Sequence, residues 1–135
     1  MRTRRHVAVL AALAAFSALP IVRSAPAIAA EAMPFSDAAF EAAQRSGRPI
    51  LIEVSAPWCP ICRTQKPILA KLAAEPRFKD LVIYGIDFDS QKDLLRRLNV
   101  RMQSTLIAYK GATEVGRSVG ETQPEWIEGL VEKTL

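Results

Sequence analysis

The chain has 135 residues, which is enough for one domain with a sizeable core, and a formal net charge of +4. This excess comes from four arginines within the first 23 residues, and the rest of the chain carries 14 basic and 14 acidic residues. A balanced charge excludes a broad basic surface for nucleic acid. The single histidine, His6, lies in the same N-terminal stretch, so the remaining chain has no histidine for a catalytic dyad or a metal site.

Residues 1–29 have the three-part layout of a secretory signal peptide. An arginine-rich start precedes an Ala/Val/Leu run that ends at Pro20, and Ala27-Ile28-Ala29 is a small-x-small cleavage signal. The apolar run is shorter than the roughly 20 residues that a membrane-spanning helix needs. We therefore expect cleavage near Ala29/Ala30, export to the periplasm, and one folded domain over residues 30–135.

Two classes of export signal fit this leader. Arg4-Arg5 resembles the twin-arginine pattern, and an ordinary Sec signal also begins with basic residues. No cysteine lies near the cleavage site, which argues against a bacterial lipoprotein anchor.

A short linker over 31–35 is predicted to lead into the first helix. Ser36 is a good N-cap, and Gly47 suits the C-terminal end of that helix. The run 50–55 is short, apolar and β-branched, so it predicts a buried central strand. Glu53 is the one charged residue within it.

The second helix is predicted to begin at Pro60 and to continue to about Leu72, with Pro67 as an internal kink. A second strand is expected over 81–88. Ser90, with an acidic residue three positions later, then resembles a capping box that opens a short helix.

Two more strands are expected over 105–109 and 114–119, joined by a tight hairpin at 110–112. Thr122 and the acidic residue three positions later predict a capping box for a final helix that ends near residue 133. Together these elements predict an α/β fold with a mixed, four-stranded central sheet and helices on both of its faces.

The chemistry is predicted to lie in Cys59-Pro60-Ile61-Cys62, between a buried strand and a helix. At this spacing both sulfur atoms lie on one face of the helix and can close a small disulfide ring. The helix N-terminus stabilises the thiolate of Cys59, and such positions lower a cysteine pKa to about 3.5–7.5. We expect Cys59 to attack a partner disulfide and the deeper Cys62 to resolve the mixed disulfide.

Cys62 needs a proton acceptor for that second step. Glu53, buried on the preceding strand, is the candidate nearest in the sequence, because buried acids with shifted pKa values concentrate at active sites. The alternative is that Glu53 is a structural charge paired with a cation such as Lys66.

The segment from Glu53 to Cys62, followed by Pro67, resembles the thioredoxin family. A strand leading into Trp-Cys-x-x-Cys is a specific signal, and the segments 105–111 and 119–120 resemble the family's closing hairpin. The resemblance covers residues 35–135. It implies the thioredoxin fold, thiol–disulfide exchange through a redox-active disulfide without another cofactor, and a proton-accepting role for Glu53, where the family usually has Asp.

The sequence departs from the family at Ser104, where thioredoxins have a cis-proline. A cis bond before a residue other than proline costs about 3–4 kcal/mol, so we expect a trans peptide bond between Gln103 and Ser104. We expect Gln103 and Ser104 to pair with an extended substrate backbone, and Trp58 and Ile61 to form an apolar docking patch. Structural roles are expected for the following three residues: Pro60, Pro67 and Gly120.

The resemblance implies oxidised proteins as substrates and a membrane-embedded electron donor as the partner that regenerates the dithiol. A reductant is favoured by the buried acid and by the lack of histidine between the cysteines. We expect a monomer with no bound metal. Three alternatives stay open: a structural disulfide, a metal-bridged dimer that shares the cysteines, and a non-catalytic binding module of the same fold.

Overall fold

The computed structural model describes residues 31–135, so the predicted signal peptide and its cleavage site lie outside the described residues. Five strands form one mixed sheet in the order β1-β3-β2-β4-β5. Pairing is parallel for β1 with β3 and for β3 with β2, and antiparallel for β2 with β4 and for β4 with β5. The strand bounds are β1 Met33–Pro34, β2 Pro49–Ser55, β3 Val82–Asp87, β4 Thr105–Lys110 and β5 Thr113–Val119.

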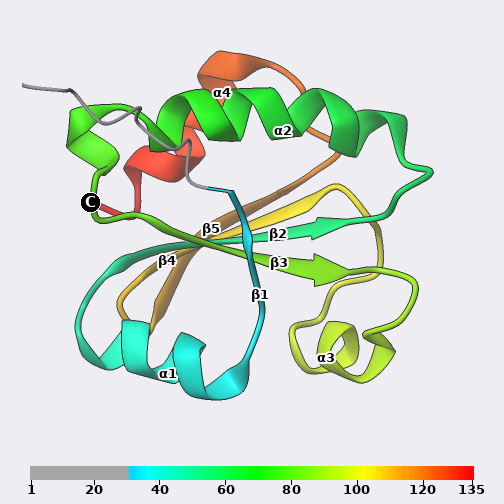
Figure 1. Cartoon of the computed structure of the whole chain (residues 1–135), viewed down its shortest axis with the longest axis horizontal. Coiled ribbons are helices and arrows are strands. Elements are labelled where there is room, and N and C mark those ends of the chain that lie inside the picture. The colour runs from blue at the N-terminus through cyan, green and yellow to red at the C-terminus, as the bar shows by residue number, and fades with distance from the viewer. Residues whose placement is uncertain (1–30) are drawn as a thin grey trace, which may run out of the picture.

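Helices cover both faces of the sheet, as Figure 1 shows. One face carries α2 and α4, and the other carries α1 and α3. The helix bounds are α1 Asp37–Arg45, α2 Pro60–Ala73, the 3₁₀ turn η1 Pro76–Phe78, α3 Lys92–Arg97 and α4 Pro124–Glu132. This arrangement confirms the predicted fold class. Within the described residues, every helix is too short or too polar to cross a membrane.

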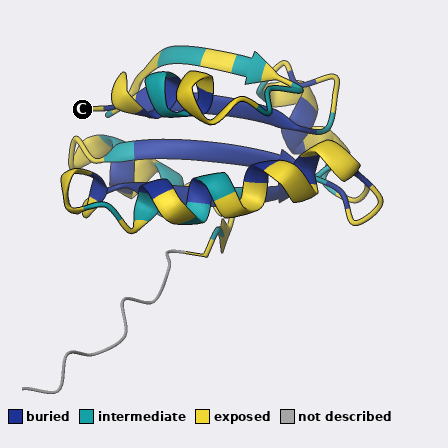
Figure 2. Cartoon of the chain, turned by 90° about the horizontal axis from the view of Figure 1, so that it is seen from above, coloured by how far each residue is buried: buried dark blue, intermediate teal, exposed yellow. Residues whose placement is uncertain are grey.

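The core has two layers because alternate residues of the central strands point to opposite faces. On β2, Ile50, Ile52 and Val54 pack toward α1 and α3, while Leu51 packs toward α2 and α4. The central strands are buried between helices whose outer faces are exposed (Figure 2). A strand that is buried on both faces is nearly all apolar. This is why the apolar run of β2 correctly predicted a central strand.

The sheet has one strand more than predicted, because part of the expected linker forms β1. Met33 and Pro34 pair with Tyr84 and Gly85, and the Phe35 N–H donates to the Gly85 carbonyl at 3.1 Å. A strand of two exposed residues shows no hydrophobic alternation, so its sequence gives no signal.

The predicted N-cap of the first helix is confirmed, but those of the last two helices are wrong. The Ser36 hydroxyl accepts the Ala39 N–H at 3.1 Å. By contrast, α3 and α4 begin after Gln91 and Gln123, neither of which caps with its side chain. Ser90 lies one residue before the N-cap position of α3, and its hydroxyl donates to the carboxylate of Asp87 on β3.

Candidate active site

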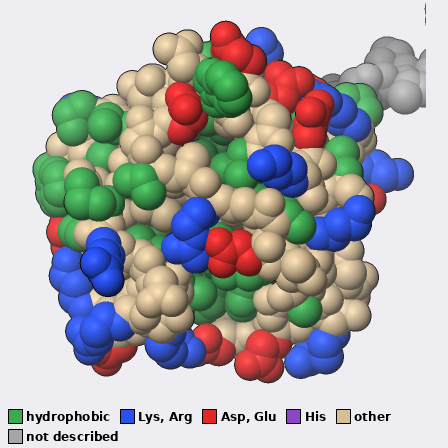
Figure 3. All heavy atoms as spheres, turned by 180° about the vertical axis from the view of Figure 1, so that it is seen from behind, with side chains coloured by type: hydrophobic (Ala, Val, Ile, Leu, Met, Phe, Trp, Pro, Cys, Tyr) green, Lys and Arg blue, Asp and Glu red, His purple; other side chains and the backbone are tan. Residues whose placement is uncertain are grey.

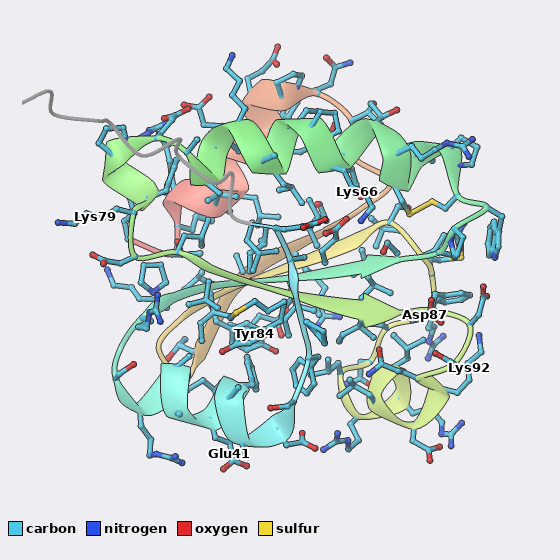
Figure 4. The ribbon with its side chains drawn as sticks, viewed as in Figure 1. Glu41, Lys66, Lys79, Tyr84, Asp87 and Lys92 are labelled. Carbon is cyan, nitrogen blue, oxygen red and sulfur yellow. A yellow bond between two sulfur atoms is a disulfide. The ribbon has the colours of Figure 1, made fainter. Side chains whose placement is uncertain are left out.

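The two cysteines form a disulfide where β2 ends and α2 begins. Cys59 is the N-cap of α2, and Pro60 occupies the first helical position, where no N–H is needed. The Cα atoms of Cys59 and Cys62 are 5.3 Å apart, and the Cys62 N–H donates to Cys59 Sγ at 3.1 Å. Figure 4 shows the bond at the start of the helix. The sulfur of Cys59 therefore accepts a backbone N–H that a thiolate would accept more strongly.

Exposure does not distinguish the two cysteines in this oxidised state. Each is 1% exposed, and both pack with Ala56 and the ring of Phe88. The expectation that Cys62 lies deeper than Cys59 is therefore not met. The asymmetry lies in hydrogen bonding, because only the Cys59 sulfur is the acceptor at the helix N-terminus.

Glu53 faces the interior between the sheet and α2. It is 3% exposed and pairs across the sheet with Leu106, which packs with the α2 and α4 residues. Cys62 is buried on α2, so both side chains lie in the same layer. Glu53 and Cys62 therefore face the same space between the sheet and α2.

One cation approaches this carboxylate. The Lys66 Nζ atom lies 3.4 Å from Glu53 Oε1, and its side chain points from α2 toward the sheet (Figure 4). Glu53 Oε1 has no hydrogen-bond partner among the described residues. The proposed ion pair with Lys66 therefore exists, and it is made at the carboxylate oxygen that has no hydrogen bond.

Exposed hydrophobic side chains surround the disulfide. Trp58 is 53% exposed and Ile61 38%, and each comes directly before one of the two cysteines in the sequence. Met102 and Val119 are also exposed. Val119 pairs with Thr105, the first residue of β4, and Met102 lies three residues before Thr105, so both are near the end of the sheet where β2 leads to the cysteines. Figure 3 shows hydrophobic side chains gathered at one end of the molecule, on the left in that view. This apolar rim, made of Trp58, Ile61, Met102 and Val119, is available for docking.

A turn after β3 holds Trp58 in place. The indole Nε1–H donates to Asp89 Oδ2 at 2.9 Å. Asp87 Oδ1 shapes this turn by accepting the backbone N–H groups of Asp89 and Ser90 and the Ser90 hydroxyl. The hydrogen bond from the Ser90 hydroxyl lowers the pKa of Asp87 below its ordinary value, with a further contribution from the Ser90 N–H. The two aspartates thus form a turn that supports Trp58.

The segment before β4 lies beside the end of β2. The Gln103–Ser104 peptide bond is trans, as expected, because the described residues contain no cis bond. Ser104 has a φ of 59°, which is the left-handed region, and its N–H donates to the Val54 carbonyl at 2.8 Å. The Gly120 N–H donates to the Ser104 carbonyl at 3.0 Å, and Gly120 itself has a φ of 72°.

Three residues of the site could not be predicted from the Trp-Cys-x-x-Cys motif. Met102 joins the apolar rim, Asp89 holds Trp58, and the buried Gln65 contacts the segment before β4. Gln65 could have been singled out, because it is the one polar residue on the buried face of α2 beyond the cysteine pair. Pro67 lies inside α2 as predicted. Within residues 31–135, no group of three or more His, Cys, Asp or Glu side chains is placed to hold a metal ion.

A family model for thioredoxin matches residues 31–133. The chain belongs to the thioredoxin family. A thioredoxin from Coprinus comatus is 30% identical over 96 residues, which cover 71% of this chain and 90% of that protein. Thioredoxin Asp f 29 from Aspergillus fumigatus is 30% identical over 62% of this chain and 76% of its own length.

Solved structures give the same result for the fold. The crystal structure of Trxlp from Edwardsiella tarda EIB202 has 44% identity and a TM-score of 0.72, over 75% of this chain and 98% of that one. Thioredoxin NaTrxh from Nicotiana alata has 22% identity and a TM-score of 0.68, which supports the fold alone. The protein belongs to the thioredoxin family and has a Cys-x-x-Cys disulfide at the start of α2. It is therefore a thiol–disulfide oxidoreductase.

Proposed function

We propose that this protein is an exported reductant of protein disulfides, with Cys59 as nucleophile and Cys62 as resolving thiol. The observation that carries the proposal is the disulfide at the N-cap of α2, inside a rim of four exposed hydrophobic side chains. Such a rim fits an unfolded or loosely folded protein segment better than a small polar disulfide. The leader over 1–29 supports a periplasmic location.

The exchange proceeds in two balanced steps. The thiolate of Cys59 attacks one sulfur of the substrate disulfide, a mixed disulfide forms, and the second substrate sulfur leaves as a thiolate that takes a proton. Cys62 then gives its proton to Glu53, and its sulfur attacks Cys59 Sγ. The Cys59–Cys62 bond forms, and the substrate's remaining sulfur leaves reduced. Two electrons have passed from the dithiol to the substrate.

The oxidised protein must then be reduced by a dithiol donor, which is itself oxidised to a disulfide. For a periplasmic protein we propose a membrane-embedded donor, since such a donor can carry electrons across the membrane. Within this proposal the buried Glu53 carboxylate accepts the Cys62 proton at the moment of resolution. We propose that the protein works as a monomer.

Insulin reduction with dithiothreitol as electron donor tests the activity. The chain over residues 30–135 is expected to accelerate insulin precipitation, and Cys59→Ser is expected to abolish that acceleration. Cys62→Ser is expected to accumulate a mixed disulfide with insulin, visible by mass spectrometry without reductant. Full activity in Cys59→Ser would refute the assigned nucleophile.

Direction and location need their own measurements. Equilibration with glutathione buffers gives the reduction potential, for which a value near −270 mV fits a reductant and one near −120 mV an oxidant. Cell fractionation of the full chain, with and without residues 1–29, tests export. A protein that stays in the cytoplasm with its leader intact would overturn the proposed location.

A further inference from the structure

Gln65 is a fully buried polar side chain on the helix that carries both cysteines. It lies three residues after Cys62 and is 0% exposed. Its Nε2 group donates to the Ser104 carbonyl at 3.2 Å and to the Glu121 carbonyl at 2.8 Å. One amide therefore connects α2 to the segment just before β4 and to the segment just after β5, which lie together at the open end of the β4–β5 hairpin. Its Oε1 atom has no hydrogen-bond partner among the described residues, so the two donor bonds alone hold this buried amide in place.

The segment that Gln65 contacts is held in an unfavourable backbone conformation. Ser104 has a φ of 59°, a left-handed conformation that is unfavourable for a residue other than glycine. Such a conformation persists only where its surroundings determine it. Here the Ser104 N–H donates to Val54, and the Ser104 carbonyl accepts from both Gly120 and Gln65. Of these bonds, only the one from Gln65 comes from α2.

The conformation of Ser104 decides which backbone groups point outward beside the disulfide. The Gln103 N–H has no hydrogen-bond partner among the described residues. The Gln103 carbonyl accepts only the hydroxyl of its neighbour Ser104 within the same part of the chain. An extended substrate segment can pair with these two groups, next to Met102 of the apolar rim. The left-handed turn at Ser104 therefore presents this pairing edge.

We propose that Gln65 is a positioning residue that locks the 102–105 segment to α2, so that the pairing edge and the cysteines keep a fixed relative position. Gln65 touches neither the substrate nor the sulfur atoms in this role. It acts on the affinity and orientation of extended protein substrates. The inference rests on the proposed reduction of protein disulfides and names a residue that determines the substrate class.

Comparing two substrates separates this role from a purely structural one. Gln65→Leu keeps the volume and removes both donor bonds. It should lower kcat/KM for insulin about tenfold, which is the effect expected from the loss of one or two neutral hydrogen bonds. Most of this loss should come from a higher KM. With 5,5′-dithiobis-(2-nitrobenzoic acid), which has no backbone to pair, the rate should change less than about twofold. Both assays start from the reduced protein in buffer without denaturant.

Two further variants complete the test. Thr134→Val is the matched control, because it removes a buried hydroxyl that donates to the Val131 carbonyl near the C-terminus, on the side of the molecule away from the start of α2 (Figure 1). It should lower stability and leave the ratio of the two rates unchanged. Ser104→Gly removes the backbone cost at φ 59°, so in the Gln65→Leu background it should recover at least part of the insulin rate.

The outcomes are distinct. Equal loss on both substrates, or an unchanged ratio in Gln65→Leu, would overturn the positioning role. Failure of Ser104→Gly to recover any rate would do the same. Failure of the proposed function differs from both, because the unmodified protein would then not reduce insulin at all.

Discussion

The ammonium of Lys66 lies 3.4 Å from Oε1 of Glu53, although the two residues differ sharply in burial. Glu53 is almost fully buried in the centre of the sheet, whereas 57% of the Lys66 side chain is exposed on α2. The lysine therefore keeps contact with water while its charge faces a carboxylate that has almost none. This pair makes Glu53 both a structural charge and a candidate proton acceptor, and the two roles can be separated by experiment.

Lys66→Met is expected to destabilise the oxidised protein by about 1–3 kcal/mol, because it leaves a buried carboxylate without its cation. Urea unfolding at pH 7 measures the change. Lys71→Met, at an exposed position on the same helix, should change stability by less than about 0.5 kcal/mol. In a Glu53→Leu background the effect of Lys66→Met should disappear, and its persistence there would show that the pair is not its cause.

Glu53→Gln is expected to slow the resolving step about tenfold or more, because the amide cannot accept the Cys62 proton as a carboxylate does. Rapid acid quenching followed by mass spectrometry should show the mixed disulfide with insulin accumulating. Glu125→Gln, at an exposed position on α4, serves as the control. If Glu53→Gln lowers stability without accumulation of that intermediate, Glu53 has only a structural role.

Asp87→Asn is expected to change how acid affects the turn that supports Trp58. The pKa of Asp87 is lowered in the folded protein by the hydrogen bond from Ser90. Its carboxylate therefore stabilises the fold above the unfolded pKa of about 3.9, and this contribution is lost as the pH falls through the lower folded value. Asp87→Asn should thus unfold at lower urea than the unmodified protein at pH 7, and the difference should shrink below pH about 4.

The control for this titration is Asp80→Asn, because Asp80 is exposed. It should not reproduce the pH-dependent difference. Trp58 fluorescence reports on the same turn, provided that Trp126, the other tryptophan of the chain, is replaced by Phe. A stability difference that stays constant from pH 7 to pH 2 would exclude the charge of Asp87 as its source.

Gly116→Ala is expected to destabilise the protein by about 1–3 kcal/mol through overpacking between β5 and α4. A Cβ atom at Gly116 would lie 2.9 Å from Cδ1 of Leu130, closer than side chains in a packed core allow. Gly129→Ala is the matched opposite, because a Cβ atom there has nothing within 4 Å inside a helix. It should stabilise the protein by about 0.5–1 kcal/mol, as thermal unfolding can measure. Equal effects of both substitutions would contradict this account of the packing.

The strongest predictions from sequence concern features whose cause lies within a few residues. The apolar run of β2, the proline at the first position of α2 and the spacing of Cys59 and Cys62 determine a strand, a helix start and a disulfide. The trans bond before Ser104 also followed from the cost of the alternative. The caps predicted at Ser90 and Thr122 were wrong because each helix begins one residue later, after Gln91 and Gln123, and the exact first residue of a helix is weakly specified by local pattern.

The amino-acid sequence alone determined the family, the fold class and the pair of sulfur atoms at a helix N-terminus, since these depend on short-range geometry. Only the tertiary structure decided that Lys66 faces Glu53, that Asp89 holds Trp58, and that Gln65 reaches carbonyls 39 and 56 residues away. Such partners are set by strand register and helix packing, which the whole chain fixes together. They are therefore visible only once the sheet and its helices are assembled.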